Sequence, residues 1–251
     1  MPGSTEYKVF MRLDKYLVEE AYFESRNRAL DAIKAGKVKV NGKAAKPSVK
    51  VDRDTLIEIE DEKFYVSRAA RKLENFLNEY EVDLRDKKAL DIGSSTGGFA
   101  QIVLERGVAT LDCVDVGRDQ LHRSLREDGR LSLHEETDIR DFTASEPFEV
   151  VTCDVSFISI LQIIETIDSL SRDGADIVIL YKPQFEVGRE VKRDSRGVVQ
   201  DLDAIARKKE AFEAHAKELG WELKRQARSQ VRGREGNQEY LYHFVKRSTA
   251  Q

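Results

Sequence analysis

The first 60 residues combine two short helical patterns with short alternating strands. Apolar residues recur at helical spacing over residues 13–17 and again over residues 29–33. Ser25 precedes the second pattern where an N-cap is expected, and Gly36 follows it in the position that glycine favours after a helix. The pattern therefore predicts a helix-loop-helix that ends at Gly36.

A hairpin is predicted directly after these helices. Val38 and Val40 alternate with polar residues, and Asn41-Gly42 is typical of a two-residue turn between antiparallel strands. A second alternating run over residues 55–60 closes the unit. We expect a small α+β domain over residues 1–60, with its core in residues 11–60.

From residue 67 onward, apolar runs alternate with helical patterns. We expect residues 61–66 to be a linker and Ser67 to cap a helix over residues 67–77. Buried strands are predicted at residues 88–92, 110–115, 149–154 and 176–181. An antiparallel pair at one edge is predicted at residues 221–226 and 240–245, joined by residues 232–237. Such alternation is typical of an α/β fold, so residues 67–251 are predicted to form a Rossmann-like, doubly wound sheet.

Charge is distributed unevenly along the chain. The formal net charge is -4 and 35% of the residues are charged, which argues against a uniformly basic protein. Between Glu24 and Lys50, however, there are eight lysines or arginines and only two acids, Glu24 and Asp31. This local surplus suits a phosphate-binding surface, and it equally suits a solvated helix surface.

The composition disfavours several classes of protein. Cys113 and Cys153 lie in apolar runs, as buried reduced thiols do, so nothing implies an oxidising compartment. The N-terminus has no secretory pattern, and no stretch approaches the ~18 apolar residues that span a bilayer. The four histidines show no ligand spacing, so we expect no metal site. A soluble, cytoplasmic protein is predicted.

The segment from Asp91 to Phe99 is the best candidate for a ligand site. It follows a predicted buried strand, and its three glycines let the backbone approach a ligand closely. Its spacing is GxxxGG, unlike the GxGxxG of dinucleotide-binding turns, and it has no lysine for a P-loop. Asp115 ends the next strand, where an acid can accept hydrogen bonds from ribose hydroxyls. We interpret the segment as a nucleoside pocket, with an ordinary tight turn as the alternative.

Two charged residues lie at the ends of other predicted strands. Asp154 ends one strand and Lys182 follows another. Ligands of open α/β sheets bind outside the carboxyl ends of the strands, so both residues are candidates for chemistry. Because buried charges are costly unless they are paired, a purely structural Asp154–Lys182 ion pair is the alternative.

The first domain resembles a known RNA-binding family. The residues that carry the resemblance are Met11 to Leu17, Ser25-Arg26, Gly36 to Gly42 and Lys46-Pro47-Ser48. They resemble the RNA-binding domain named after ribosomal protein S-four, in which a helix-loop-helix presents basic residues to structured RNA. The resemblance implies RNA contacts for Arg12, Lys15, Arg26, Arg28, Lys34 and Lys37. A small domain whose charges are merely solvated is the alternative.

Four further segments resemble the FtsJ-like ribose 2′-O-methyltransferases. They are Ser67 to Leu73, Cys153 to Ser159, Tyr181 to Glu186 and Gly236 to Tyr240. That family has a Lys-Asp-Lys-Glu tetrad, which matches Lys72, Asp154, Lys182 and Glu239. With the S-four-like domain in front, the chain is similar to the TlyA (haemolysin A-like) rRNA methyltransferases over nearly its whole length.

This resemblance implies S-adenosylmethionine as methyl donor and ribosomal RNA, within ribosomal subunits, as partner. The expected cofactor-binding residues are Asp91, Gly93, Ser94, Ser95, Thr96, Gly97, Gly98, Phe99, Asp115 and Asp138. Of these, Asp91 and the glycine turn would border the methionine part, Asp115 the ribose and Asp138 the adenine. The segment departs from the commoner GxGxG pattern by having Ser95 at the middle position. Cytidines of 16S or 23S rRNA are the implied targets, with an influence on susceptibility to ribosome-binding antibiotics.

The tetrad also suits this reaction on chemical grounds. A ribose 2′-hydroxyl is a weak nucleophile that must lose its proton as it attacks, and a neutral Lys182 could take that proton. Neutralising a lysine near pH 7 costs roughly 4–5 kcal/mol, because its reference pKa is about 10.4. The sulfonium charge and Lys72 favour the neutral amine, whereas the two carboxylates oppose it. The sequence therefore leaves the sign of the pKa shift open.

Three alternatives stay open at this point. Residues 186–197, which are polar, basic and glycine-punctuated, form either a disordered surface loop or, directly after Lys182, a lid or RNA-touching loop. An NAD-dependent oxidoreductase could use the same sheet, although GxGxxG is missing. A non-catalytic RNA-binding or haemolysin-like protein is disfavoured by the lack of an apolar span.

Overall fold

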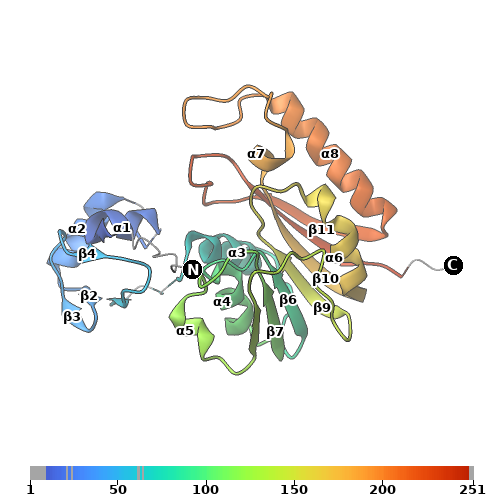
Figure 1. The fold of residues 1–251 in the computed structure, drawn as a ribbon. Coiled ribbons are helices and arrows are strands. Elements are labelled where there is room, and N and C mark those ends of the chain that lie inside the picture. The colour runs from blue at the N-terminus through green and yellow to red at the C-terminus, as the bar shows by residue number, and fades with distance from the viewer. Residues whose placement is uncertain (1–9, 21, 24, 61–62, 64, 249–251) are drawn as a thin grey trace, which may run out of the picture. The chain divides into compact units, whose positions relative to one another are not determined.

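The computed structural model describes residues 10–248 other than 21, 24, 61, 62 and 64 (Figure 1). The chain divides between Arg68 and Ala69 into two compact units. Each unit has its own hydrophobic core, and the two are described separately.

The predicted helix-loop-helix of the first unit is confirmed as α1 (Leu13–Glu19) and α2 (Arg26–Lys34). The Ser25 hydroxyl accepts a hydrogen bond from the Arg28 amide at 3.3 Å, as an N-cap does. Gly36 lies just beyond the helix with a φ of 75°, in the left-handed region where glycine is not strained.

The predicted hairpin is also confirmed. Strand β2 (Val38–Val40) pairs with β3 (Lys43–Ala44) through Asn41-Gly42, whose φ values are 50° and 76°. Two consecutive positive φ values define the type I′ turn that this dipeptide favours. On its other side β2 pairs with β5 (Ile57–Ile59), also antiparallel.

A two-stranded sheet of β1 (Met11–Arg12) and β4 (Lys50–Val51) completes the first unit. Strands of two residues are too short to show alternation, so no sequence pattern signals them. Apolar side chains of both helices and of the strands form the core, including Leu13, Leu17, Ala29, Ile33, Val38, Val51 and Ile57.

Seven strands of the second unit form one sheet in the order β11-β12-β10-β9-β6-β7-β8. They are β6 (Lys88–Ile92), β7 (Thr110–Val114), β8 (Leu131–His134), β9 (Phe148–Cys153), β10 (Ser171–Tyr181), β11 (Trp221–Arg228) and β12 (Tyr240–Lys246). The strands from β8 to β10 are parallel, whereas β12 is antiparallel to β10 and to β11. The chain turns from one half of the sheet to the other between β6 and β9, which is where open α/β sheets bind ligands. The predicted Rossmann-like sheet with an antiparallel edge pair is confirmed.

Two strands differ from the prediction. Strand β8 lies at the edge, and its half-exposed residues form no continuous apolar run. Strand β10 begins at Ser171 rather than at Asp176. The sequence pattern missed the first part of the strand because exposed polar residues interrupt the apolar run there, and the register with β9 shifts between the same two residues.

The helices of the second unit are α3 (Arg68–Glu79), α4 (Gly98–Glu105), α5 (Arg123–Arg126), α6 (Ile164–Leu170), α7 (Pro183–Glu186) and α8 (Leu202–Glu218). Helix α8 packs Phe212 edge-on against Tyr242 and Phe244 of β12. Ser67 directly precedes Arg68, the first residue of α3, and so occupies the predicted N-cap position. Its hydroxyl is buried and has no hydrogen-bond partner among the described residues, so the predicted side-chain cap is not formed.

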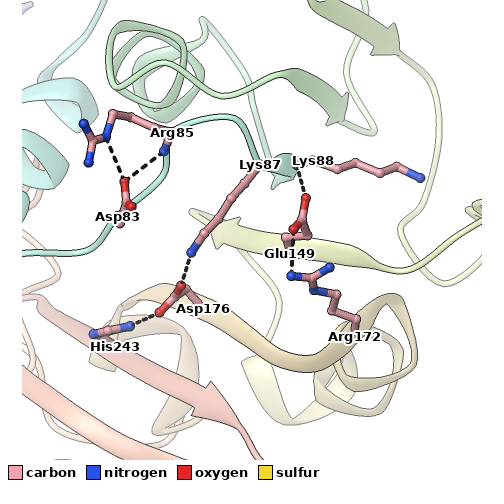
Figure 2. A network of polar contacts seen from close by, with 8 residues as sticks. All are labelled: Asp83, Arg85, Lys87, Lys88, Glu149, Arg172, Asp176 and His243. Atoms are coloured by element: carbon pink, nitrogen blue, oxygen red, sulfur yellow. Dashed lines mark hydrogen bonds and ion pairs between the residues drawn. The ribbon is translucent and has the colours of Figure 1, made fainter.

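A polar network joins four strands near the start of β6 (Figure 2). Lys87 Nζ donates to Asp176 Oδ2 at 2.8 Å, and His243 Nε2 lies 2.8 Å from Asp176 Oδ1. Glu149 of β9 pairs with Arg172 at 2.7 Å. Burial raises the pKa of Asp176, but hydrogen bonds from His243 and Lys87 lower it by more, so the net pKa lies below its ordinary value. This carboxylate is therefore ionised, and it links β10 to β12 and to the residue that precedes β6.

We expect Asp176→Asn to lower the free energy of unfolding at neutral pH by about 3 kcal/mol, because it removes the buried carboxylate that Lys87 and His243 share. A depressed folded-state pKa stabilises the fold above the unfolded pKa of about 3.9, and this contribution is lost as the pH falls through the folded pKa. The stability difference between wild type and variant should therefore vanish in acid. Urea unfolding of both proteins at neutral and acidic pH measures it, and a pH-independent difference would contradict the assignment.

Candidate active site

Three tetrad residues lie at the ends of neighbouring strands of the second unit, and the fourth lies within a helix. Lys72 lies in α3, Asp154 follows β9, Lys182 follows β10, and Glu239 precedes β12. Tyr181 of β10 is the register partner of Tyr240 of β12. Because β10 and β12 are adjacent and antiparallel, Lys182 and Glu239 leave the sheet at the same end.

Two close ion pairs result. Lys72 Nζ donates to Glu239 Oε2 at 2.5 Å, and the two side chains are 9% and 3% exposed. Lys182 Nζ lies 2.6 Å from Asp154 Oδ1, with side chains 11% and 14% exposed. Lys182 also donates to Ser156 Oγ at 2.9 Å. Each buried lysine thus has its own carboxylate, which offsets the desolvation of both charges.

The protonation state of Lys182 follows from its surroundings. Burial lowers the pKa of Lys182, whereas Asp154 and then Glu239 raise it. The carboxylates outweigh burial, so the pKa of Lys182 lies above its ordinary value. Before any ligand binds, the amine is therefore protonated near neutral pH.

A cavity of about 320 Å³ lies beside Asp154 at the switch point of the sheet. Four of the predicted cofactor-binding residues line it, namely Gly93, Ser95, Asp115 and Asp138. Gly93 has a φ of 77°, and a Cβ there would lie 2.9 Å from the Asp154 carbonyl oxygen. Only glycine lets the turn approach the end of β9 so closely. Apolar side chains of Ile92, Val114, Ile139 and Ile158 form part of the remaining wall.

Asp115 is fixed at the end of β7 by the backbone. Its Oδ2 accepts from the Ser95 amide at 2.8 Å, and its Oδ1 accepts from the Gly117 amide at 2.7 Å. A carboxylate oxygen has more than one acceptor position, so both oxygens can still accept from a ligand hydroxyl. The carboxylate is therefore oriented in advance in the cavity wall.

Asp138 is held by a neighbouring side chain instead. Arg140 donates to both of its oxygens, at 2.9 and 2.6 Å, and lowers the pKa of Asp138 to about 2. Asp138 is thus a fixed, ionised acceptor in the same cavity wall as Asp115.

Asp91 lies behind the cavity rather than in its wall. It is fully buried, and Thr152 Oγ1 donates to its Oδ1 at 2.7 Å. Its Oδ2 has no hydrogen-bond partner within the described residues. Burial raises the pKa of Asp91 to about 7. The unpaired oxygen leaves an acceptor next to the glycine turn.

The other predicted cofactor-binding residues shape the turn and the helix after it. Ser94 is buried, and the Thr96 carbonyl accepts from the His122 amide at 3.1 Å. Gly97 precedes α4 with a φ of 91°, and Gly98 begins the helix. Phe99 is 2% exposed and packs in the core. These residues are not among those that line the cavity.

Three residues that motif reasoning missed surround the tetrad. Ser156 contacts Lys182, and Gln184 Nε2 donates to Glu239 Oε1 at 2.9 Å. Phe157 lines the cavity, is 90% exposed and has a φ of 66°, which is strained for a bulky residue. Proximity to Asp154 and Lys182 in the chain is the only sequence signal for them.

The segment between α7 and α8 makes hydrogen bonds to residues near Glu239. Arg193 donates to the carbonyl oxygens of Gln184 and Gly188 at 2.9 and 3.0 Å. The Val199 amide donates to Asn237 Oδ1 at 3.0 Å, which joins this segment to the turn before β12. These hydrogen bonds favour a segment held against the second unit over a free surface loop, and its role as a lid or RNA-touching loop stays a prediction.

The six predicted RNA-binding residues of the first unit are all exposed: Arg12, Lys15, Arg26, Arg28, Lys34 and Lys37. Arg12 ends β1, Lys15 lies in α1, and the other four lie in α2 or just after it. This exposure is what contacts with RNA require.

Comparison with known proteins identifies the class. The FtsJ-like methyltransferase profile matches residues 65–246, and the S4 domain profile matches residues 11–57. The 23S rRNA (cytidine-2′-O)-methyltransferase TlyA of Campylobacter jejuni is 43% identical over 255 residues, covering 94% of this chain and all of the relative. The 16S/23S rRNA (cytidine-2′-O)-methyltransferase TlyA of Mycobacterium tuberculosis is 37% identical over 236 residues, covering 92% and 88%.

A solved structure agrees with these relatives. A candidate hemolysin from Streptococcus thermophilus matches with a TM-score of 0.77 and 33% identity, covering 98% of this chain and 91% of that one. Fold and site thus define an FtsJ-like methyltransferase with an S4 domain. More narrowly, the chain belongs to the TlyA family, as the resemblance predicts.

Two further observations concern a membrane-spanning helix and a metal site. In the part of the chain that the structure describes, no helix is both long and apolar enough to cross a membrane. Within the same residues, no group of three or more histidine, cysteine or acidic side chains could hold a metal ion.

Proposed function

We propose that this protein transfers a methyl group from S-adenosylmethionine to the 2′-hydroxyl of a cytidine in ribosomal RNA. The observation that carries the proposal is the Lys182–Asp154 pair beside the nucleoside-sized cavity, because Asp154 both lines the cavity and binds Lys182. The activities of the relatives from C. jejuni and M. tuberculosis support the choice of rRNA and cytidine. The oxidoreductase alternative has no support from the family.

The cavity residues suit the cofactor. The glycine turn at Gly93 would border the methionine part of the cofactor. Asp115 would accept hydrogen bonds from the ribose hydroxyls, and Asp138 would face the adenine. Asp91 is fully buried and does not line the cavity, so it would support the glycine turn that borders the methionine part rather than contact the cofactor directly. When bound, S-adenosylmethionine supplies an electrophilic methyl group on a positively charged sulfur.

The tetrad residues would activate the nucleophile. Lys182 hydrogen-bonds the 2′-hydroxyl and accepts its proton as the oxygen attacks, after its own ammonium proton has been lost. Asp154 and Ser156 hold the Lys182 amine in position, and Glu239 holds Lys72 in the same site. Phe157, an exposed aromatic residue at the cavity, is available to stack on a nucleobase.

The raised pKa of Lys182 predicts a pH-dependent rate. Only the neutral amine can accept a proton, so the single-turnover rate should rise by up to tenfold per pH unit from neutral toward alkaline pH. Asp154→Asn removes a cause of the raised pKa, so the remaining activity of that variant should reach its plateau at lower pH than wild type. Rapid-quench methyl transfer across pH measures both profiles, and a flat wild-type profile would argue against Lys182 as the base.

Asp115→Ala is expected to weaken S-adenosylmethionine binding by about 1–3 kcal/mol, because charge-assisted hydrogen bonds to the ribose are lost. The binding defect should exceed the defect in the rate at saturating cofactor. Isothermal titration measures the affinity, with Asp119→Ala as a control for an exposed acid of the same region. Unchanged affinity in a folded variant would show that Asp115 does not hold the cofactor.

The proposed function itself is tested with ribosomal subunits from cells that lack this gene. Purified protein and S-adenosylmethionine carrying a labelled methyl group should produce 2′-O-methylcytidine in their rRNA. Label found on a base, or no label in rRNA, would refute the proposal. The same strains test the expected effect on susceptibility to ribosome-binding antibiotics.

A further inference from the structure

Asp14 of α1 is a buried carboxylate held by two arginines of the first unit. Arg12 Nε and Nη2 donate to its Oδ1 and Oδ2 at 3.0 and 3.2 Å. Arg26 Nε and Nη2 both donate to Oδ2, at 2.8 and 2.6 Å. Both arginines contact Oδ2, so their guanidinium groups are neighbours although they come from different segments.

The arginines cover the carboxylate and remain accessible themselves. The Asp14 side chain is 0% exposed, whereas the side chains of Arg12 and Arg26 are 45% and 52% exposed. Neither Nη1 group donates to any described residue, so each guanidinium keeps donors for a ligand. The hydrogen bond from Arg12 is the largest influence that lowers the pKa of Asp14, to about 2, so the carboxylate stays ionised near neutral pH.

The charges of this cluster match one phosphodiester. Two guanidinium groups and one carboxylate leave a single positive charge at the surface, and a phosphodiester carries one negative charge. Guanidinium forks suit phosphate oxygens geometrically. A long side chain that is already held loses less conformational entropy when it binds.

We propose that Arg12 and Arg26, held in place by Asp14, form a preorganised clamp for one phosphodiester of the RNA backbone, with Asp14 as its positioning residue. This inference rests on the proposed function, since it assigns a contact with the rRNA substrate. Asp14 itself touches no RNA. Its effect on affinity would come entirely from the two arginines.

Asp14→Asn distinguishes a clamp from simple charge attraction. The substitution removes a negative charge beside the RNA-binding surface, so charge attraction alone predicts equal or tighter binding. The clamp predicts about tenfold weaker binding, because two side chains must then be ordered at the moment of binding. It also predicts a shallower dependence of log Kd on log salt, by about one unit or less, because one phosphate contact is weakened.

Asp31→Asn is the matched control. It makes the same charge change at an exposed position of α2, and Asp31 contacts neither arginine through any described hydrogen bond. We expect it to bind as tightly as wild type or slightly tighter. Arg26→Lys provides a second test, because it keeps the positive charge next to Asp14 but loses the planar set of guanidinium donors. It should weaken RNA binding about threefold or more.

Binding of each full-length variant to unmethylated large ribosomal subunits is measured by fluorescence titration at several salt concentrations. Circular dichroism melting shows whether α1 and α2 stay folded at the titration temperature. If Asp14→Asn unfolds the first unit, the affinity of Arg26→Lys alone tests the clamp. The clamp is overturned if a folded Asp14→Asn protein, or Arg26→Lys, binds like wild type. Failure of wild type itself to bind or methylate the subunits would instead count against the proposed function.

Discussion

Lys182→Ala is expected to abolish methyl transfer, with a loss of roughly 1,000-fold or more, while S-adenosylmethionine affinity stays within a few-fold of wild type. A positioned general base contributes about 10²–10⁴-fold, and loss of this lysine also leaves Asp154 without its cationic partner. The cavity is lined by other elements, so the cofactor site should survive. Single-turnover methylation and isothermal titration measure the two effects.

Lys182→Arg separates a base from a structural ion-pair partner. Arginine can still pair with Asp154, but its pKa lies so far above neutral pH that it stays charged and cannot accept a proton there. If the pair were only structural, this variant would retain activity. We expect it to be nearly as inactive as Lys182→Ala, and substantial turnover by either folded protein would remove Lys182 from the role of base.

The remaining pair should behave as part of the same unit. Lys72→Ala and Glu239→Ala are each expected to impair catalysis severely, because each leaves a buried charge without its partner at 2.5 Å. Combined with Lys182→Ala, either should add little, since groups that act together lose most of their effect with the first substitution. Fully additive losses would show that the two ion pairs act independently.

Removal of residues 1–62 is the second change with a very large expected effect. All tetrad and cavity residues lie in the second unit, which has its own core, whereas the six exposed basic residues lie in the first. The remaining protein should therefore fold and bind S-adenosylmethionine with nearly wild-type affinity. Methylation of ribosomal subunits at submicromolar protein should fall by about 100-fold or more, because several phosphate contacts are lost.

The kinetic form of this defect is diagnostic. A loss of RNA affinity appears at low subunit concentration and is relieved in part as subunits are added, whereas a catalytic defect is not. Methylation as a function of subunit concentration distinguishes the two. Wild-type rates for the shortened protein at every concentration would show that recognition lies in the second unit, for instance in the segment between α7 and α8.

Local features of the fold were determined by the sequence alone. The Ser25 cap, the end of α2 before Gly36 and the Asn41-Gly42 hairpin depend on interactions between residues a few positions apart. The buried strands β6, β7 and β9 are visible as apolar runs to within one residue at each end. The tetrad residues were identifiable because each lies in a short segment that resembles a motif of the FtsJ-like family.

Only the tertiary structure decided which charges pair. Lys72 and Glu239 are 167 positions apart, and β12 must insert antiparallel beside β10 to bring Glu239 to the lysine. The pKa of Lys182 is raised because two nearby carboxylates outweigh the effect of burial. Burial and the nearby carboxylates are both absent from an unfolded chain. The same holds for Asp14, whose sequence neighbours do not reveal that it is buried beneath two arginines. Short-range patterns thus determined elements such as α1, α2, β6, β7 and β9 and the reactive residue types. Long-range contacts determined the partners of these residues, their protonation states and the exposed donors.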